Sequence, residues 1–105
     1  MNFLVGPGAR EDVAEIAEYI ESRTAGRGEE FVAAVERAYT AIELQPRMHS
    51  PADDGPAGVE AREYLLRGFR YRIVFVILGD EVTVLSVAHV SKKPRHWHDR
   101  LSNDP

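Results

Sequence analysis

Four arginines and one histidine are the side chains of this sequence best suited to chemistry. Arg62, Arg67, Arg70 and Arg72 lie close together in the chain, and His89 follows. Guanidinium groups bind phosphate through several hydrogen bonds, and histidine exchanges a proton near neutral pH. Brought together at a strand edge, these residues could hold a phosphate and move a proton.

A purely structural explanation competes with this one. Charged side chains at strand edges prevent sheets from pairing with other chains. Edge protection accounts well for Arg67 and Arg70, which flank a Gly-Phe turn, and less well for Arg62 and His89. Both explanations remain open on the residues alone.

The segment VAHVSKKPRHWHDR, residues 87–100, is cationic, aromatic and rich in histidine. His89, His96 and His98 match no standard zinc spacing, and the chain has no cysteine. We therefore expect no metal and no cofactor. Trp97 is expected to be a structural residue that anchors this segment on the body of the protein.

The first half of the chain predicts one strand and two helices. Residues 3–5 form a short apolar run that a Gly-Pro-Gly breaker ends. Apolar residues then recur at helical spacing from residue 9 to residue 20 and again from 31 to 42, until Pro46 ends the second helix. The short joint between them predicts an antiparallel helical hairpin.

The second half predicts three strands. After a loop at 46–58, the apolar period changes from 3.6 to 2, and strands are expected at 59–67, 70–78 and 81–90. A short helix or ordered tail then follows. The predicted fold is α+β in the order β-α-α-β-β-β, a helical hairpin on a small antiparallel sheet, with one domain spanning residues 1–105.

The strand at 70–78 is apolar on both faces, although the sequence offers only one helical hairpin to cover a face. The C-terminal tail, a second copy or another protein must cover the other face. We expect a partner to do so, with Val74, Val76 and Leu78 partly exposed in the free chain and bound by that partner.

Charge divides the chain. The net charge is −4, but residues 1–58 carry five lysines and arginines against eleven acidic residues, whereas residues 59–101 carry eight against five. This asymmetry suggests one cationic face for an acidic partner. The longest apolar run, residues 73–78, is too short to cross a bilayer, and the N-terminus lacks the features of a signal peptide, so a cytoplasmic protein is expected.

An ordered set of motifs resembles the RelE/ParE superfamily of bacterial type II toxins over residues 9–100. The set consists of AREDVAEIAEYI, the second helix FVAAVERAYTAIELQP, Arg62 on the next strand, the triplet Tyr-Arg-Ile, a strand ending at His89, and a basic Pro-x-x-Trp. The resemblance implies a helical hairpin on an antiparallel sheet. It also implies a cognate antitoxin whose disordered segment wraps the toxin in a hetero-oligomer.

The superfamily has two main activities. RelE-like members cleave mRNA on the ribosome without a metal, and the resemblance would then make Arg62, Arg72 and His89 catalytic. ParE-like members poison DNA gyrase, and Arg67, Lys92, Lys93 and Arg95 would then contact the target. A third possibility is a non-toxic binding module of the same fold.

Departures from the nuclease pattern favour the ParE-like activity. The region before Arg62 reads SPADDGPAGVE and is acidic, where the nucleases carry extra lysines. No tyrosine follows the last strand, and the sequence pI is about 5.5, whereas nucleases that bind the ribosome are strongly basic. Gyrase is therefore the expected target, and the ribosome with its mRNA is the alternative.

Overall fold

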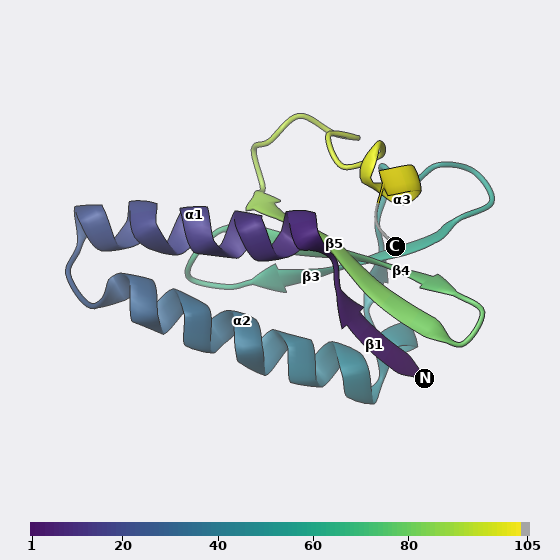
Figure 1. Ribbon diagram of the computed structural model, residues 1–105, viewed down its shortest axis with the longest axis horizontal. Helices are drawn as coiled ribbons and strands as arrows, with labels where there is room; N and C mark the ends of the chain where they lie inside the picture. The colour runs from purple at the N-terminus through teal and green to yellow at the C-terminus, as the bar shows by residue number, and fades with distance from the viewer. Residues whose placement is uncertain (104–105) are drawn as a thin grey trace.

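The computed structural model describes residues 1–103 as a helical hairpin packed on a five-stranded sheet (Figure 1). The predicted fold class is confirmed. The hairpin consists of α1 (Pro7–Arg23) and α2 (Arg27–Leu44). Among the described residues, no helix has both the length and the apolar character that crossing a membrane requires.

The strands lie in the order β1-β5-β4-β3-β2. Their bounds are β1 (Asn2–Val5), β2 (Ser50–Pro51), β3 (Glu60–Leu66), β4 (Tyr71–Leu78) and β5 (Glu81–His89). The antiparallel meander β3-β4-β5 agrees with the prediction. Two features are additional: β1 pairs in parallel with β5, and the predicted loop contains the 3₁₀ helix η1 (Pro46–Met48) and the two-residue β2.

The two helices approach closely where α2 begins. A Cβ atom on Gly28 would lie 2.6 Å from the carbonyl oxygen of Ala17, so only glycine fits there. The carboxylate of Glu21 accepts hydrogen bonds from the backbone N–H groups of Gly26 and Gly28, at 2.7 and 2.9 Å. Glu21 therefore satisfies free donors at the start of α2 and holds the hairpin closed.

The first core lies between the hairpin and the sheet. Its fully buried members include Phe31, Val35 and Ile42 of α2 with Ile73 and Phe75 of β4. The amphipathic helices and the alternating strands each contribute one apolar face to this layer.

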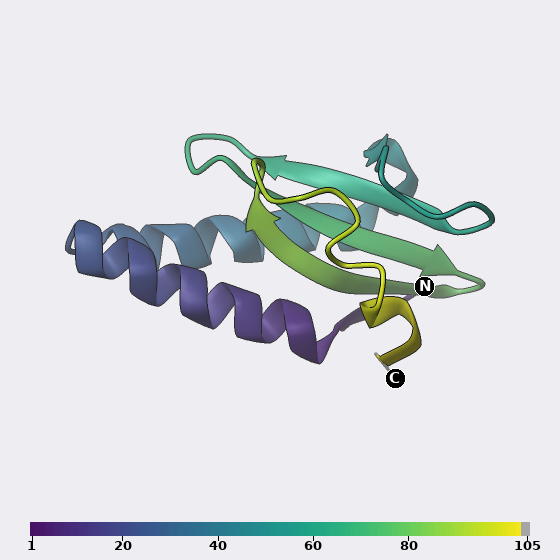
Figure 2. The ribbon, with the colours of Figure 1, turned by 90° about the horizontal axis from the view of Figure 1, so that it is seen from above.

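A second core lies on the opposite face of the sheet and corrects one prediction. Val74 and Val76 are 0 % and 2 % exposed, not partly exposed as expected, because they pack with Leu85 and the fully buried Trp97. In Figure 2, the C-terminal segment passes across the strands before it enters α3 (Arg100–Asn103). The chain's own tail covers this face, and only Leu78, 57 % exposed, remains accessible.

Candidate functional site

Asp54, in the loop before β3, is the centre of the largest polar network. Its carboxylate accepts two hydrogen bonds from Arg72 of β4, at 2.6 and 3.1 Å. Arg72 also donates to Glu63 of β3 at 2.9 Å. The Arg72 side chain is only 14 % exposed, and two carboxylates neutralise it, so it is not available to clamp a phosphate.

The same carboxylate fixes the C-terminal tail. Asp54 Oδ2 accepts hydrogen bonds from the backbone N–H of Arg95 at 3.0 Å and the indole N–H of Trp97 at 2.9 Å. The Nε2 atom of His98 hydrogen-bonds to the Asp54 carbonyl oxygen. Arg95 adopts φ of 69°, a left-handed conformation that a non-glycine residue holds only when its surroundings impose it.

This environment strongly perturbs the acidity of Asp54. Burial alone would raise the pKa of its carboxyl group. Hydrogen bonds from Arg72, Arg95 and Trp97 outweigh that effect and hold the pKa well below its ordinary value. Asp54 is therefore ionised at neutral pH, and its negative charge joins the loop, β4 and the tail.

Arg62 lies on the other face of the sheet from Arg72. It is paired with Phe75, whose side chain faces the helices. Its guanidinium donates to the carbonyl oxygen of His49 at 2.7 Å and to Glu60 at 3.1 Å. A sheet separates the two arginines that were expected to act together.

His89 shares a sheet face with Arg62 but lies far from it. His89 is paired with Tyr71 and Arg62 with Phe75, so four residues of β4, about 13 Å, separate the two rows. The Nδ1 atom of His89 accepts a hydrogen bond from the Ser91 N–H at 3.1 Å. The structure thus brings none of the three expected catalytic residues together.

His89 instead lines a pocket of about 260 Å³ between α1, β5 and the tail. Tyr71, Lys92 and His96 also line it. Burial, together with the charges of Lys92 and nearby arginines, lowers the pKa of His96 below its ordinary value. His96 is therefore neutral at pH 7, and its buried Nε2 atom has no hydrogen-bond partner among the described residues.

Asp12 of α1 and Arg100 of the tail meet at an irregularity of β5. Leu85 is an extra residue in β5, because Ser86 pairs with Val74 while Val84 pairs with the next residue of β4. Asp12 accepts hydrogen bonds from the Val87 N–H at 3.0 Å and from Arg100 at 2.7 Å, and Arg100 donates to the Leu85 carbonyl oxygen. The pair satisfies backbone groups at the bulge and holds the tail to α1.

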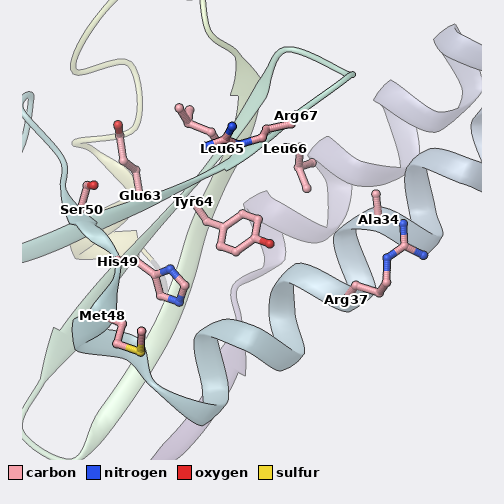
Figure 3. A pocket seen from close by; sticks show the side chains of 10 residues that line it. All are labelled: Ala34, Arg37, Met48, His49, Ser50, Glu63, Tyr64, Leu65, Leu66 and Arg67. Carbon is pink, nitrogen blue, oxygen red and sulfur yellow. The ribbon is translucent and has the colours of Figure 1, made fainter.

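A larger pocket of about 540 Å³ lies at the β3 edge of the sheet, on the helix side (Figure 3). Tyr64 lies at its centre, with its hydroxyl group directed toward α2. The His49 ring packs against the Tyr64 ring, with the two ring centroids 5.2 Å apart. Arg37 of α2 and Arg67, at the end of β3, also line the pocket. Arg67 was expected to contact a target, whereas Arg37 was not predicted.

Lys92, Lys93 and Arg95, the other residues expected to contact a target, are exposed on the tail. Lys92 and Arg95 line a pocket of about 530 Å³ on the tail side of the β3 edge, together with Leu65. Figure 3 shows the Arg67 side chain beside Leu65, directed away from Tyr64. Arg67, Lys92 and Arg95 therefore line pockets that share Leu65 of β3.

Sequence reasoning missed Asp54, Asp12 and Arg37. Asp54 stands in a stretch whose composition is typical of a turn, and the indole N–H that it binds lies 43 residues away. A helical acidic residue such as Asp12 looks like surface charge. Among residues 1–103, no three histidine, aspartate or glutamate side chains could together hold a metal ion.

Comparisons with known proteins agree with this fold. Residues 4–94 match the family described as the ParE toxin of the type II toxin–antitoxin system parDE. A solved structure titled as the chromosomal ParDE TA system from P. aeruginosa is similar with a TM-score of 0.70 and 15 % identity, over 85 % of this chain and 95 % of that one. No curated protein has significant sequence similarity to this chain. The family match spans most of the sequence, and the chain belongs to the ParE toxin family of type II toxin–antitoxin systems.

Proposed function

We propose that this protein is a cytoplasmic toxin that arrests growth by poisoning DNA gyrase and that a cognate antitoxin neutralises it. Membership of the ParE toxin family supports the toxin role. The observation that carries gyrase over mRNA as the target is the separation of Arg62, Arg72 and His89.

A metal-free ribonuclease must neutralise a crowded phosphate and move two protons at one place. Arg72 is committed to Asp54 and Glu63, and Arg62 lies across the sheet from it. A gyrase poison needs a binding surface instead. The exposed cations Lys92, Lys93 and Arg95 supply such a surface for an acidic target.

One observation favours a second candidate, the RelE-like ribonuclease. His89, Lys92 and His96 line one pocket with Tyr71, although Asp12 and Glu15 line it too. This set of residues differs from the expected catalytic set because it contains neither Arg62 nor Arg72. In this candidate, His89 would act as the acid or base.

Induced expression in a bacterium tests both candidates. Wild type should stop growth, Lys92→Glu with Lys93→Glu should relieve the arrest, and His89→Ala should leave it intact. The matched control is Arg10→Glu with Arg23→Glu on α1. Purified wild type should also inhibit gyrase supercoiling, and early mRNA should stay intact.

Other results would replace this function. Three results together would establish the ribonuclease: cut mRNA at early times, gyrase supercoiling that purified wild type does not inhibit, and a His89→Ala variant that no longer stops growth. Normal growth at confirmed expression of folded wild type would leave a non-toxic binding module.

A further inference from the structure

We propose that residues 90–98, called the strap below, form an acid-sensitive switch: protonation of His96 releases the strap from the sheet while the rest of the fold stays intact. The strap leaves β5 and crosses the strands before α3 (Figure 2). It carries the exposed cations Lys92, Lys93 and Arg95. Its release is a property of the fold and does not depend on the identity of the target.

His96 lies beside the residue that anchors the strap. Trp97 follows it in the chain and is fully buried in the second core. The Nε2 atom of His96 is buried as well and has no hydrogen-bond partner among residues 1–103. A neutral ring leaves this one nitrogen unsatisfied, whereas a protonated ring would place a charged N–H donor there without an acceptor. The docked strap therefore favours neutral His96.

Two carboxylates near His96 are already engaged. Asp12 is paired with Arg100 at 2.7 Å, and Asp54 with Arg72 at 2.6 Å. An imidazolium at position 96 would have to compete with these guanidinium groups for an acceptor. Because each pair is close to neutral as a unit, neither compensates a new positive charge beside it.

Ionisable groups from each element packed against His96 surround it. They are Asp12 and Glu15 of α1, Asp54 of the loop before β3, Tyr71 and Arg72 of β4, His89 of β5, and Lys92 and Arg100 of the C-terminal segment. Glu15 is exposed and forms no ion pair with His96. Burial, Lys92 and the two arginines outweigh the opposite effect of Asp54 and lower the pKa of His96.

Acid therefore acts against the docked strap. Below about pH 6.5, the ordinary pKa of an exposed histidine, the released strap binds a proton that the docked strap excludes. The equilibrium constant for release then rises by up to about tenfold per pH unit, until the pH reaches the lowered pKa of docked His96. His98 does not share this behaviour, because its Nε2 atom hydrogen-bonds to the Asp54 carbonyl oxygen and a protonated ring keeps that donor.

Trp97 is a specific probe of the strap, because it is the only tryptophan of the chain and its indole N–H donates to Asp54. Hydrogen exchange of this N–H, corrected for the intrinsic rate, should lose protection at least about threefold between about pH 7.5 and 5.5. The Ile73 amide, in the centre of the sheet, should remain more protected at every pH. That difference distinguishes release of the strap from global unfolding.

A matched pair of variants assigns the response to one ring. His96→Gln is neutral at every pH and should remove the pH dependence of Trp97 protection. His98→Gln removes the histidine on the other side of Trp97 and should keep the wild-type response. If His96→Gln leaves Trp97 unprotected already at about pH 7.5, an NMR titration of the wild-type ring decides, and its pKa should lie below about 6.5.

Several results would overturn the switch. Trp97 protection that does not change with pH in wild type would do so, as would an acid response that persists in His96→Gln. Equal protection of Trp97 and Ile73 would show that the strap does not open separately. A His96 pKa at or above the ordinary value would show that the docked strap tolerates the protonated ring.

Discussion

The indole N–H of Trp97 donates a hydrogen bond to Asp54 Oδ2 at 2.9 Å, across 43 residues of sequence. Trp97 is fully buried against Val74, Val76 and Leu85. Trp97 therefore contributes both a buried hydrogen bond and apolar packing. Together these interactions hold in place the segment that carries Lys92, Lys93 and Arg95. Several consequences of this arrangement are measurable.

Removing the carboxylate should destabilise the fold. In Asp54→Ala, the guanidinium of Arg72, 14 % exposed, would keep only Glu63 as an ionic partner. We expect a loss of about 3 kcal/mol in the free energy of unfolding, measured by urea denaturation. The neighbouring exposed Asp53, changed to Ala, serves as control and should behave as wild type. Equal stability of the two variants would contradict the role of Asp54.

Stability should depend on pH through the same group. The folded pKa of Asp54 is depressed, so its contribution is complete above the unfolded value of about 4 and declines as pH falls below it. The difference in urea midpoint between wild type and Asp54→Asn should therefore be constant from pH 7 to 5 and narrow in strong acid. A difference that instead grows with acidification would contradict the assignment. Asp53→Asn should follow wild type throughout.

Two substitutions separate the roles of Trp97. Trp97→Ala removes the plug of the second core and should destabilise by about 3–5 kcal/mol. Trp97→Phe keeps most apolar contacts but loses the donor to Asp54, and should cost about 1–3 kcal/mol. Thermal unfolding followed by circular dichroism would rank their melting temperatures. The Ala variant must melt below the Phe variant, and the Phe variant below wild type.

Val76→Glu should impair folding. Val76 is 2 % exposed, and a carboxylate there would lie without a partner in the apolar second core. Leu78→Glu, on the same strand face but 57 % exposed, is the matched control and should remain folded. A folded Val76→Glu protein of wild-type stability would show that the tail does not seal this face.

Local patterns were enough to predict most of the fold. The 3.6-residue period of the helices and the alternation along β3 and β4 reflect burial of one face, which sets the apolar pattern of residues close together in the sequence. The same alternation already places Arg62 and Arg72 on opposite faces. The sequence pattern therefore already counted against a catalytic site that contains both arginines.

Contacts between distant segments could not be predicted in this way. The parallel pairing of β1 with β5 and the binding of the tail by Asp54 depend on where separate segments meet. A turn-rich loop gives no sign of which tail amide its carboxylate will bind. The sequence predicted that Trp97 anchors the tail, but the cover of the second sheet face was still wrongly assigned to a partner. One tryptophan in a mostly polar segment did not indicate that the tail would bury Val74 and Val76 completely.

The parallel pairing of β1 with β5 also governs when the protein can fold during its synthesis. β1 leaves the ribosome first, but its partner strand begins only at Glu81, and the plug at Trp97 follows later still. Neither hydrophobic layer can close before the last part of the chain is made. A nascent chain interrupted before residue 81 would lack the pairing of β5 with β1 and β4 and remain open to proteases, so the folded domain forms only after β5 and Trp97 have been translated.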